Sequence, residues 1–366
     1  MTTRLPLCVI GGGQIGLRHV QVAMASDRVR LTAVMEPVAE RRAVLMAMGL
    51  PVAATLAEVP AATRAAVVAT PTNDHAATAL DALSRGWALI VEKPLAASLA
   101  QARLLLDAAA QAGLPLVTGH HRRCHPFVQA ARGLLAALGD PVGVQGLWSL
   151  RKHDSYYDAP WRRRPGAGVL MTNLSHEVDL LHVLAGEVTE VSAMLSAARR
   201  GLAVEDTAAL SLRFSSGALG SFLISDAGAS PWGFEPASGE NPDLAISGQD
   251  YLRLTGTRGA LEFPSLRLWH GGDWRDPMTV AGGPAFARID PLQAQLHRFA
   301  AVLDGATDDV LCDGAAGLAA LAVTLAAALS GAQGCPVRPR DVPPDYRGPQ
   351  DTHPQDPAQS AGNPKG

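Results

Sequence analysis

A short glycine-rich segment behind an apolar run constrains this chain more than any other feature. The apolar run covers residues 5–10, and Gly11, Gly13 and Gly16 follow it in the spacing G-x-G-x-x-G. An apolar run of this length predicts a buried parallel strand. In a strand-to-helix turn, the first glycine permits the tight bend, the second lets backbone amides approach a pyrophosphate, and the third lets the helix pack on the strand. The segment therefore predicts the first βα unit of a dinucleotide-binding fold.

The expected nucleotide contacts extend on both sides of this turn. Gln14 and Ile15 begin the predicted helix, whose N-terminus presents a partial positive charge to phosphates. A second strand, over residues 30–35, ends in Glu36, about twenty residues past Gly16. An acidic side chain at that position accepts hydrogen bonds from ribose hydroxyls and repels a 2′-phosphate, so we predict NAD as the cofactor and disfavour NADP. Arg41 and Arg42 follow closely and could weaken this preference.

Composition narrows the class of protein. The 366 residues suggest two domains, and 48% hydrophobic residues suffice for a large core. The net charge of −3 gives no footprint for nucleic acid or membrane surfaces, and we predict neither as a partner. The four cysteines include no C-x-x-C pair, so we expect no structural metal site. We predict a cytoplasmic protein because no signal peptide precedes the first strand, and a packed helix for the apolar run 315–332.

The first third of the chain alternates short apolar runs with amphipathic segments. Strands are predicted at residues 51–53, 65–69, 88–91 and 115–118, with helices between them. This alternation predicts a doubly wound parallel sheet with ligands at the carboxyl ends of its strands. Polar clusters follow two of these strands: Thr70-Pro71-Thr72-Asn73-Asp74-His75 and Glu92-Lys93-Pro94.

The pattern changes after Gly119. Five predicted strands, residues 144–150, 187–195, 207–214, 220–225 and 251–255, indicate an α+β region with a large, mostly antiparallel open sheet. Helices are predicted at residues 126–138, 174–184, 291–303 and 315–329. We predict a Rossmann domain over residues 1–121 and a substrate and oligomerisation domain over residues 122–335. The Pro-rich tail, residues 336–366, carries too little apolar surface to order itself.

Two groups of residues could carry chemistry. Lys93 follows a strand at the sheet edge where nicotinamide is expected, and burial there would lower its pKa. His176 stands in the first turn of a helix behind a glycine-rich loop, with Thr172 and Asn173 about one turn earlier. Imidazole suits proton transfer near neutral pH, although a lone helix histidine is more often structural.

These motifs together resemble the Gfo/Idh/MocA oxidoreductases over about residues 5–335. The resemblance rests on the glycine turn with His19, Thr70-Pro71 with His75, Glu92-Lys93-Pro94, Gly119-His120-His121-Arg122-Arg123, Trp161-Arg162 and His176-x-x-Asp179. It implies that Lys93 polarises the substrate oxygen while His176 takes the hydroxyl proton. It also implies cofactor contacts from Thr70, Pro71, Asn73, His75, Glu92, Lys93, His121, Trp161 and Arg162, substrate contacts from Arg122, Tyr156, Thr172, Asn173 and His176, and a homodimer or homotetramer.

The chain departs from the commonest family pattern at one position. Many members carry an aspartate four residues before the histidine, where this chain has Thr172. A hydroxyl or the neighbouring Asn173 amide can bond substrate but cannot stabilise an imidazolium as a carboxylate does. The aromatic and basic run 151–164 is either a solvated connection or a loop over an acidic or phosphorylated substrate. The sequence does not place a second loop, residues 230–242.

We predict an NAD-dependent dehydrogenase for a secondary alcohol or ketone of a small polyhydroxylated molecule: a sugar, a cyclitol or a dihydrodiol. Redox-neutral lyase or glycosidase chemistry and imine reduction remain alternatives that use the same lysine and cofactor. A non-catalytic NAD-binding regulator is the alternative from a different class, and the absent aspartate keeps it open. Fold and motifs define chemistry, whereas loop shape selects the substrate.

Overall fold

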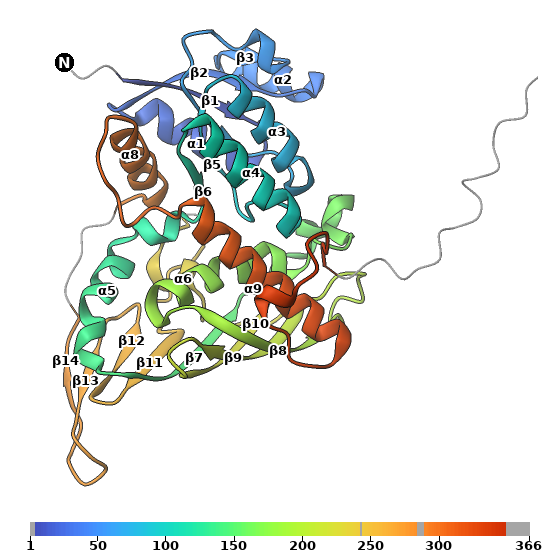
Figure 1. Ribbon diagram of the computed structural model, residues 1–366. Helices are drawn as coiled ribbons and strands as arrows, with labels where there is room; N and C mark the ends of the chain where they lie inside the picture. Colours follow the sequence, from blue (N-terminus) through green and yellow to red (C-terminus); the bar gives the residue numbers. More distant parts are fainter. Residues whose placement is uncertain (1–3, 242–243, 284–288, 349–366) are drawn as a thin grey trace, which may run out of the picture.

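Two β-sheets, joined by helices, organise the molecule (Figure 1). The computed structural model describes residues 4–241, 244–283 and 289–348. The first sheet has six strands in the order β3-β2-β1-β4-β5-β6, all parallel. Their bounds are β1 Leu5–Ile10, β2 Val29–Met35, β3 Val52–Ala53, β4 Ala65–Val68, β5 Ala88–Val91 and β6 Leu116–Thr118. This order reverses direction between β1 and β4, and ligands bind at such a switch point in doubly wound sheets.

Helices cover both faces of the parallel sheet, as the alternating sequence pattern predicts. They are α1 Gln14–Ala25, α2 Ala39–Ala47, the short 3₁₀ turn Leu56–Glu58, α3 Thr72–Ser84 and α4 Leu99–Ala112. Ser98 caps α4, because its side chain accepts a hydrogen bond from the Gln101 amide. The central strands β4 and β5 are buried along their whole length, which explains their unbroken apolar sequences.

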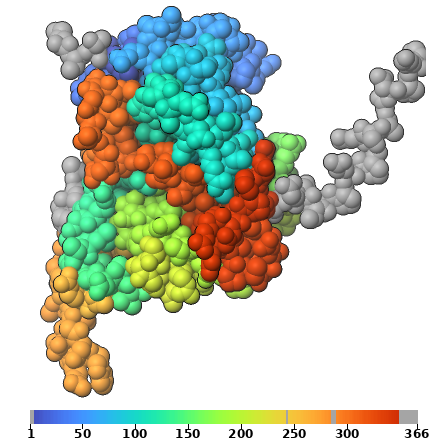
Figure 2. All heavy atoms as spheres, in the orientation of Figure 1, coloured from blue at the N-terminus to red at the C-terminus, as the bar shows by residue number. Residues whose placement is uncertain are grey.

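The second sheet has eight strands in the order β14-β13-β12-β11-β7-β10-β9-β8. Every neighbouring pair is antiparallel except β7 with β10. The strands are β7 Pro141–Ser149, β8 Val188–Ser196, β9 Thr207–Phe214, β10 Leu219–Ser225, β11 Leu252–Gly256, β12 Gly259–Phe263, β13 Leu268–His270 and β14 Thr279–Ala281. The sequence predicted five of these and missed β12, β13 and β14. The antiparallel pair β13 and β14 projects from the body of the molecule (Figure 2).

The helices of this half lie on one face of the second sheet (Figure 1). They are α5 Pro126–Leu138, α6 Ser175–Ala185, α7 Phe234–Ser238 and α9 Gly314–Gln333. The short helical turns are His121–Cys124, Asp154–Asp158, Pro160–Arg163 and Pro339–Asp341, and a π-helical turn, Leu170–Leu174, leads directly into α6. The other face of the sheet exposes apolar side chains, among them Met194 and Leu223.

The predicted boundary between the domains needs correction at the C-terminal end. Helix α8, Pro291–Leu303, belongs in sequence to the second region, but it lies beside α1 of the Rossmann domain (Figure 1). Leu292, Leu296 and Phe299 are buried in the same core cluster as strand β1. The apolar stripe of α8 therefore completes the Rossmann core, and residues 291–311 are part of that domain.

The prediction that the tail does not pack is also wrong for residues 336–348. Val337 forms a bridge with Val191 of the edge strand β8, and Val342 is buried. The Ala100 amide donates a hydrogen bond to the Pro344 carbonyl, so the segment also contacts α4. These few apolar residues suffice to order it because they cover an edge that already exists. Residues 349–366 lie outside the described residues.

Helix α9 is the apolar run 315–332 that sequence composition alone could assign to a membrane. It is long and apolar enough to cross one, yet 56% of its most apolar window is buried within the structure. It packs on β8, α6 and α4, and Gly317 lies so close to Thr118 that a Cβ there would be 1.9 Å from the Thr118 hydroxyl. The helix thus links the two sheets as a core element.

Candidate active site

The glycine turn has the geometry that its sequence predicts. Gly11 has φ +104°, and a Cβ at this position would lie 2.6 Å from the Ala69 carbonyl oxygen. A Cβ on Gly16 would lie 1.9 Å from the Gly11 carbonyl oxygen, so α1 packs directly on the turn. A Cβ on Gly13 meets nothing within 4 Å. The fold therefore requires glycine at positions 11 and 16, whereas Gly13 faces open space.

The N-terminus of α1 is free to bind an anion. Gly13 occupies the N-cap and no side chain caps the helix, so the first amide donors, at Gln14 and Ile15, lack intrahelical partners. The neighbouring Glu36 is buried, and its carboxylate accepts hydrogen bonds from the Gly12 amide at 2.9 Å and the Val38 amide at 3.0 Å. Arg41 approaches the same carboxylate at 3.4 Å. The uncapped amides and the fixed acid beside them fit an NAD diphosphate and ribose.

His75, in the segment after β4, holds the loops at the carboxyl edge of the parallel sheet. The two ring nitrogens of His75 lie 2.9 Å from the carbonyl oxygens of Thr70 and Pro94, and burial lowers the pKa of the imidazole. His75, predicted to contact the cofactor, instead connects the loops after β4 and β5. Pro71 and Asn73 are exposed at the start of α3, and the buried Thr70 hydroxyl has no hydrogen-bond partner among the described residues.

Glu92 forms a buried pair with His19, the histidine of the glycine motif. The Oε1 atom of Glu92 lies 2.7 Å from Nε2 of His19. Burial raises the pKa of Glu92, but the His19 hydrogen bond and the positive charges of His19, His121 and Lys93 outweigh burial and hold the pKa at about 2. Glu92, predicted as a cofactor contact, therefore joins the start of α1 to the loop that carries Lys93.

Lys93 crosses from the Rossmann domain to the second domain. Its Nζ atom donates a hydrogen bond of 2.8 Å to the carbonyl oxygen of Thr172, one turn before His176. Burial lowers the pKa of Lys93 to about 8; Glu92 opposes this shift, while Arg122 and Lys152 reinforce it. The structure thus brings together Lys93, Thr172 and the turn that precedes His176.

His176 lies among cations and other imidazoles. Its ring centroid is 5.7 Å from that of His120 and 5.5 Å from that of His121. Burial lowers the pKa of His176 well below its usual value, and the charges of Lys93 and Arg122 lower it further. No carboxylate within the described part of the chain forms an ion pair with it, and its Nδ1 atom is buried without a partner. His176 is a neutral imidazole at physiological pH.

Arg122, predicted to contact substrate, lies instead at the centre of a buried ion network. It is 3% exposed and pairs with Glu177 at 2.7 Å, with Glu240 at 3.3 Å and with Glu235. Because three carboxylates surround it, Arg122 has no free face for a ligand. Burial raises the pKa of Glu177 to about 7 even beside this arginine.

The second loop that the sequence could not place closes over this network. Glu235 of α7 also accepts a hydrogen bond of 2.8 Å from the Trp148 indole, and Glu240 pairs with His121. Burial lowers the pKa of His121 while Glu240 raises it, and the net effect is an increase. His121 is thus held by a carboxylate beside His176. The acidic residues of this loop carried no motif, and only their fold-dependent proximity to Arg122 identifies them.

Lys152 is a site residue that the sequence analysis missed. It lies just after β7, within the basic run 151–164, and its Nζ atom is 2.8 Å from the Asn173 side-chain oxygen and 3.4 Å from the Thr172 hydroxyl. The predicted substrate residues Thr172 and Asn173 therefore face a second lysine. The density of basic residues was the only sequence signal for it.

The remaining predicted contacts form a stack beside Lys152. Tyr156 lies between two cations: Lys152 Nζ is 4.6 Å and the Arg162 guanidinium carbon 3.9 Å from its ring centroid. Arg162 also donates to the Tyr156 carbonyl oxygen at 2.8 Å, and Trp161 is 55% exposed. Tyr156 connects with the substrate region through Lys152, whereas neither Trp161 nor Arg162 contacts Lys93 or His176.

One cluster has the residue types of a metal site. The ligand atoms of His120, Asp179 and Cys312 are buried and lie within 4.8 Å of one another. Arg123, however, donates to both oxygens of Asp179, at 2.9 Å from Nε and 2.6 Å from a terminal nitrogen. This guanidinium already supplies the positive charge at that carboxylate, which makes the cluster a poor cation site. Asp179 of α6 thus positions the helical turn His121–Cys124 against α6.

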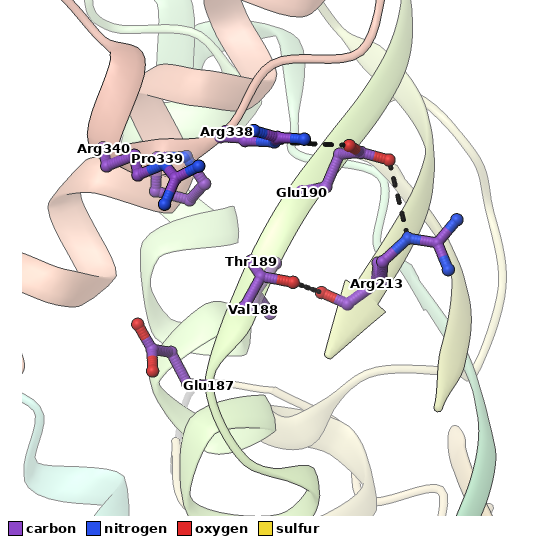
Figure 3. Close-up of a pocket in the computed structure, with 8 residues that line it drawn as sticks. All are labelled: Glu187, Val188, Thr189, Glu190, Arg213, Arg338, Pro339 and Arg340. Atoms are coloured by element: carbon purple, nitrogen blue, oxygen red, sulfur yellow. Dashed lines mark hydrogen bonds and ion pairs between the residues drawn. The ribbon is translucent and has the colours of Figure 1, made fainter. Parts of the chain in front are cut away.

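A separate cavity of about 330 Å³ lies at the β8 edge of the second sheet (Figure 3). Its walls carry both signs of charge, since Glu190 lies between Arg338 at 3.8 Å and Arg213 at 3.6 Å. None of its lining residues belongs to the Lys93–His176 region.

These features together define a nicotinamide-dependent oxidoreductase: a glycine turn with an uncapped helix, an acid at the end of β2, and a lysine and a histidine at the same sheet edge. Residues 6–120 match the family described as the oxidoreductase family with an NAD-binding Rossmann fold. Residues 128–262 match the Gfo/Idh/MocA C-terminal domain. The chain belongs to the Gfo/Idh/MocA family, and its first domain binds NAD.

Curated relatives support the family assignment. UDP-N-acetylglucosamine 3-dehydrogenase of Acidithiobacillus ferrooxidans is 30% identical over 87% of this chain and 94% of its own length. The rhizopine catabolism protein MocA of Rhizobium meliloti is 30% identical over 50% of this chain. D-apiose dehydrogenase of Paraburkholderia graminis is 28% identical over 57% of this chain. The matched part spans 58% of each of the latter two proteins.

Solved structures share the fold. An oxidoreductase from Agrobacterium radiobacter, in complex with NAD⁺, L-tartaric acid and magnesium, superposes with a TM-score of 0.76 at 20% identity, covering 92% of this chain and 99% of that one. The WlbA dehydrogenase from Bordetella pertussis, in complex with NADH and UDP-GlcNAcA, has a TM-score of 0.74 at 22% identity, with the same coverage of each chain.

Proposed function

We propose that the protein is an NAD-dependent dehydrogenase that transfers hydride between a secondary alcohol or ketone of a small polyhydroxylated molecule and nicotinamide. One observation carries this proposal: Lys93, at the carboxyl end of β5, reaches Thr172 one turn before His176. A cationic donor and a neutral imidazole therefore flank the same space at the ligand-binding edge of the sheet. Both residues can bond one substrate oxygen there.

The surroundings of the two residues assign their roles. NAD, when bound, supplies the acceptor or donor of hydride. His176 gains a proton only at high cost, because it is buried, Lys93 and Arg122 lie near it, and no carboxylate among the described residues pairs with it. Lys93 has a pKa of about 8 and exchanges a proton near neutral pH more readily. We therefore assign proton transfer to Lys93 and hydrogen bonding of the substrate oxygen to His176, the reverse of the roles that the family resemblance implied.

A sugar-like substrate agrees with the relatives. Their names include a UDP-N-acetylglucosamine 3-dehydrogenase, a D-apiose dehydrogenase and a 1,5-anhydro-D-fructose reductase, all of which act on polyhydroxylated molecules. Hydroxyls of such a substrate match the amide of Asn173 and the hydroxyl of Thr172, which stand beside the two lysines.

The direct test is turnover with NAD and a panel of sugars, sugar acids, cyclitols and dihydrodiols, followed by NADH absorbance. NADH formation with a panel member, abolished in Lys93→Met, is the expected result. NAD binding without NADH formation on any compound would contradict the dehydrogenase. Product analysis of the same incubations would then detect a redox-neutral reaction.

A further inference from the structure

Lys152 stands opposite Lys93 across the turn that precedes His176. Lys93 Nζ approaches Thr172 through the main-chain oxygen, whereas Lys152 Nζ approaches the Thr172 hydroxyl and the Asn173 side chain. The Lys152 side chain is 16% exposed, and the Tyr156 ring lies 4.6 Å from its ammonium group. The π-helical turn Leu170–Leu174 thus holds two ammonium groups next to the catalytic histidine.

The charge of Lys152 is only partly compensated. Its nearest carboxylate, Asp226, lies 3.4 Å away and is completely buried. The same carboxylate pairs with Arg200 at 3.1 Å and accepts a hydrogen bond from the Tyr157 hydroxyl. Glu205, also near, accepts a hydrogen bond from the Leu170 amide, and burial raises its pKa. Two cations therefore share one buried carboxylate.

Lys93 feels the charge of Glu92 but forms no direct ion pair within the described structure. Across the described ranges of the chain, no carboxylate oxygen lies within 4.0 Å of its Nζ atom. The two lysines together give this side of the substrate region an excess of positive charge. An anionic group on the substrate would neutralise it.

We propose that Lys152 binds a carboxylate of the substrate, so that the enzyme selects sugar acids over their uncharged counterparts. This inference rests on the proposed function, because it places the substrate between Lys93 and His176. An ammonium group has three donors, and only the Asn173 contact, at 2.8 Å, has the length of a strong hydrogen bond. The contacts to Thr172 and Asp226, both 3.4 Å, are weak enough for a substrate carboxylate to replace.

The test compares hexuronates with their uncharged amides on the protein saturated with NAD. Calorimetry would measure the binding of D-glucuronate, D-galacturonate, D-glucuronamide and D-galacturonamide to the wild type and to Lys152→Met. We expect at least one acid to bind the wild type about 10- to 100-fold more tightly than its amide. In Lys152→Met the acid should bind no better than the amide, whereas Lys152→Arg should keep most of the preference.

Arg164→Met is the matched control, because this exposed arginine belongs to the same basic run and forms no ion pair within the described structure. It should leave the preference unchanged. Equal binding of acid and amide to the wild type, or no binding of either, would overturn the inference without any variant. A preference that survives in a folded Lys152→Met would also overturn it. Acid-selective binding with no NADH formation would contradict the proposed hydride transfer while leaving the role of Lys152 standing.

Discussion

At the residue scale, the role of each charged side chain in the site depends on whether a group of opposite charge lies beside it. Burial and the nearby Lys93, Arg122 and imidazoles lower the pKa of His176. Arg122 is surrounded by three carboxylates, and Lys93 has no ion pair with a carboxylate in the described structure. The sequence analysis predicted all three as functional, Arg122 only through the family resemblance. Their roles differ because burial removes the solvent that would otherwise screen these charges.

The first prediction concerns pH. If Lys93 takes the substrate proton, kcat/KM for alcohol oxidation should rise with pH and level off above about 8, because the neutral amine predominates only above the pKa of about 8. The cationic nicotinamide of NAD⁺ would lower the pKa of Lys93 and so move the rise in kcat/KM to lower pH. Lys93→Met should lose about 10²- to 10⁴-fold in kcat while still binding NAD. A profile that stays flat from about pH 6 to about pH 9 would assign the proton to His176 instead.

The second prediction concerns Arg122. Arg122→Leu leaves Glu177 and Glu235 buried without a cation and Glu240 with only His121, so the free energy of unfolding should fall by about 3–5 kcal/mol near pH 8. Burial raises the pKa of Glu177 to about 7 although Arg122 lowers it, so without the arginine this pKa rises further above its unfolded value. The neutral Glu177 carboxyl stabilises the folded variant fully at low pH, and this stabilisation is lost as the pH rises. The loss of stability relative to the wild type should therefore be smaller near pH 5.

Denaturant unfolding at both pH values measures this effect. Arg28→Leu is the control, because Arg28 pairs with Asp304 at the exposed surface and its loss should cost less than about 1 kcal/mol. Equal losses for the two variants would contradict a buried network at Arg122.

At the element scale, the glycine turn shows why similar residues have different tasks. Gly16 permits the contact between α1 and the turn, and Gly11 adopts a positive φ that L-residues rarely reach. Gly13 has an extended backbone and open space beyond it, so it is needed only when something binds at the end of α1.

A pair of alanine variants separates these tasks. Gly16→Ala should lower the free energy of unfolding by about 1–3 kcal/mol, because its Cβ would collide with the Gly11 carbonyl. Gly13→Ala should melt like the wild type but bind NAD about tenfold or more weakly, since the methyl group enters the space for the pyrophosphate. Thermal melts and NAD titration measure both. Unchanged NAD affinity in Gly13→Ala would place the diphosphate elsewhere.

At the scale of the whole molecule, the second sheet has one covered and one open face. Helices α5, α6 and α9 lie on the same side of it (Figure 1). On the open side, the strand register aligns Met194, Ala209, Leu223 and Leu147 in one row across four strands. Met194 is 75% and Leu223 is 42% exposed. A contiguous apolar row of this kind is typical of a protein–protein interface.

We propose that this face joins two copies of the chain. Sedimentation velocity should show a dimer or larger species for the wild type, and a monomer for the double variant Met194→Glu with Leu223→Glu. The melting temperature need not fall in proportion, because both side chains lie outside the core. Met46→Glu, at an exposed apolar position on α2, should leave the assembly unchanged. A monomeric wild type would contradict the proposal.

The sequence by itself determined the Rossmann domain and the antiparallel character of the second sheet. These follow from local signals: apolar periodicity, glycine spacing and polar residues at strand ends. Tertiary structure alone decided the rest. Helix α8 returns to the first domain, residues 336–348 cover the β8 edge, His75 joins two loops, and Lys152, Glu235 and Glu240 meet the site from loops without a motif. Such contacts depend on which surfaces and charges meet after folding, and no local pattern along the chain records them.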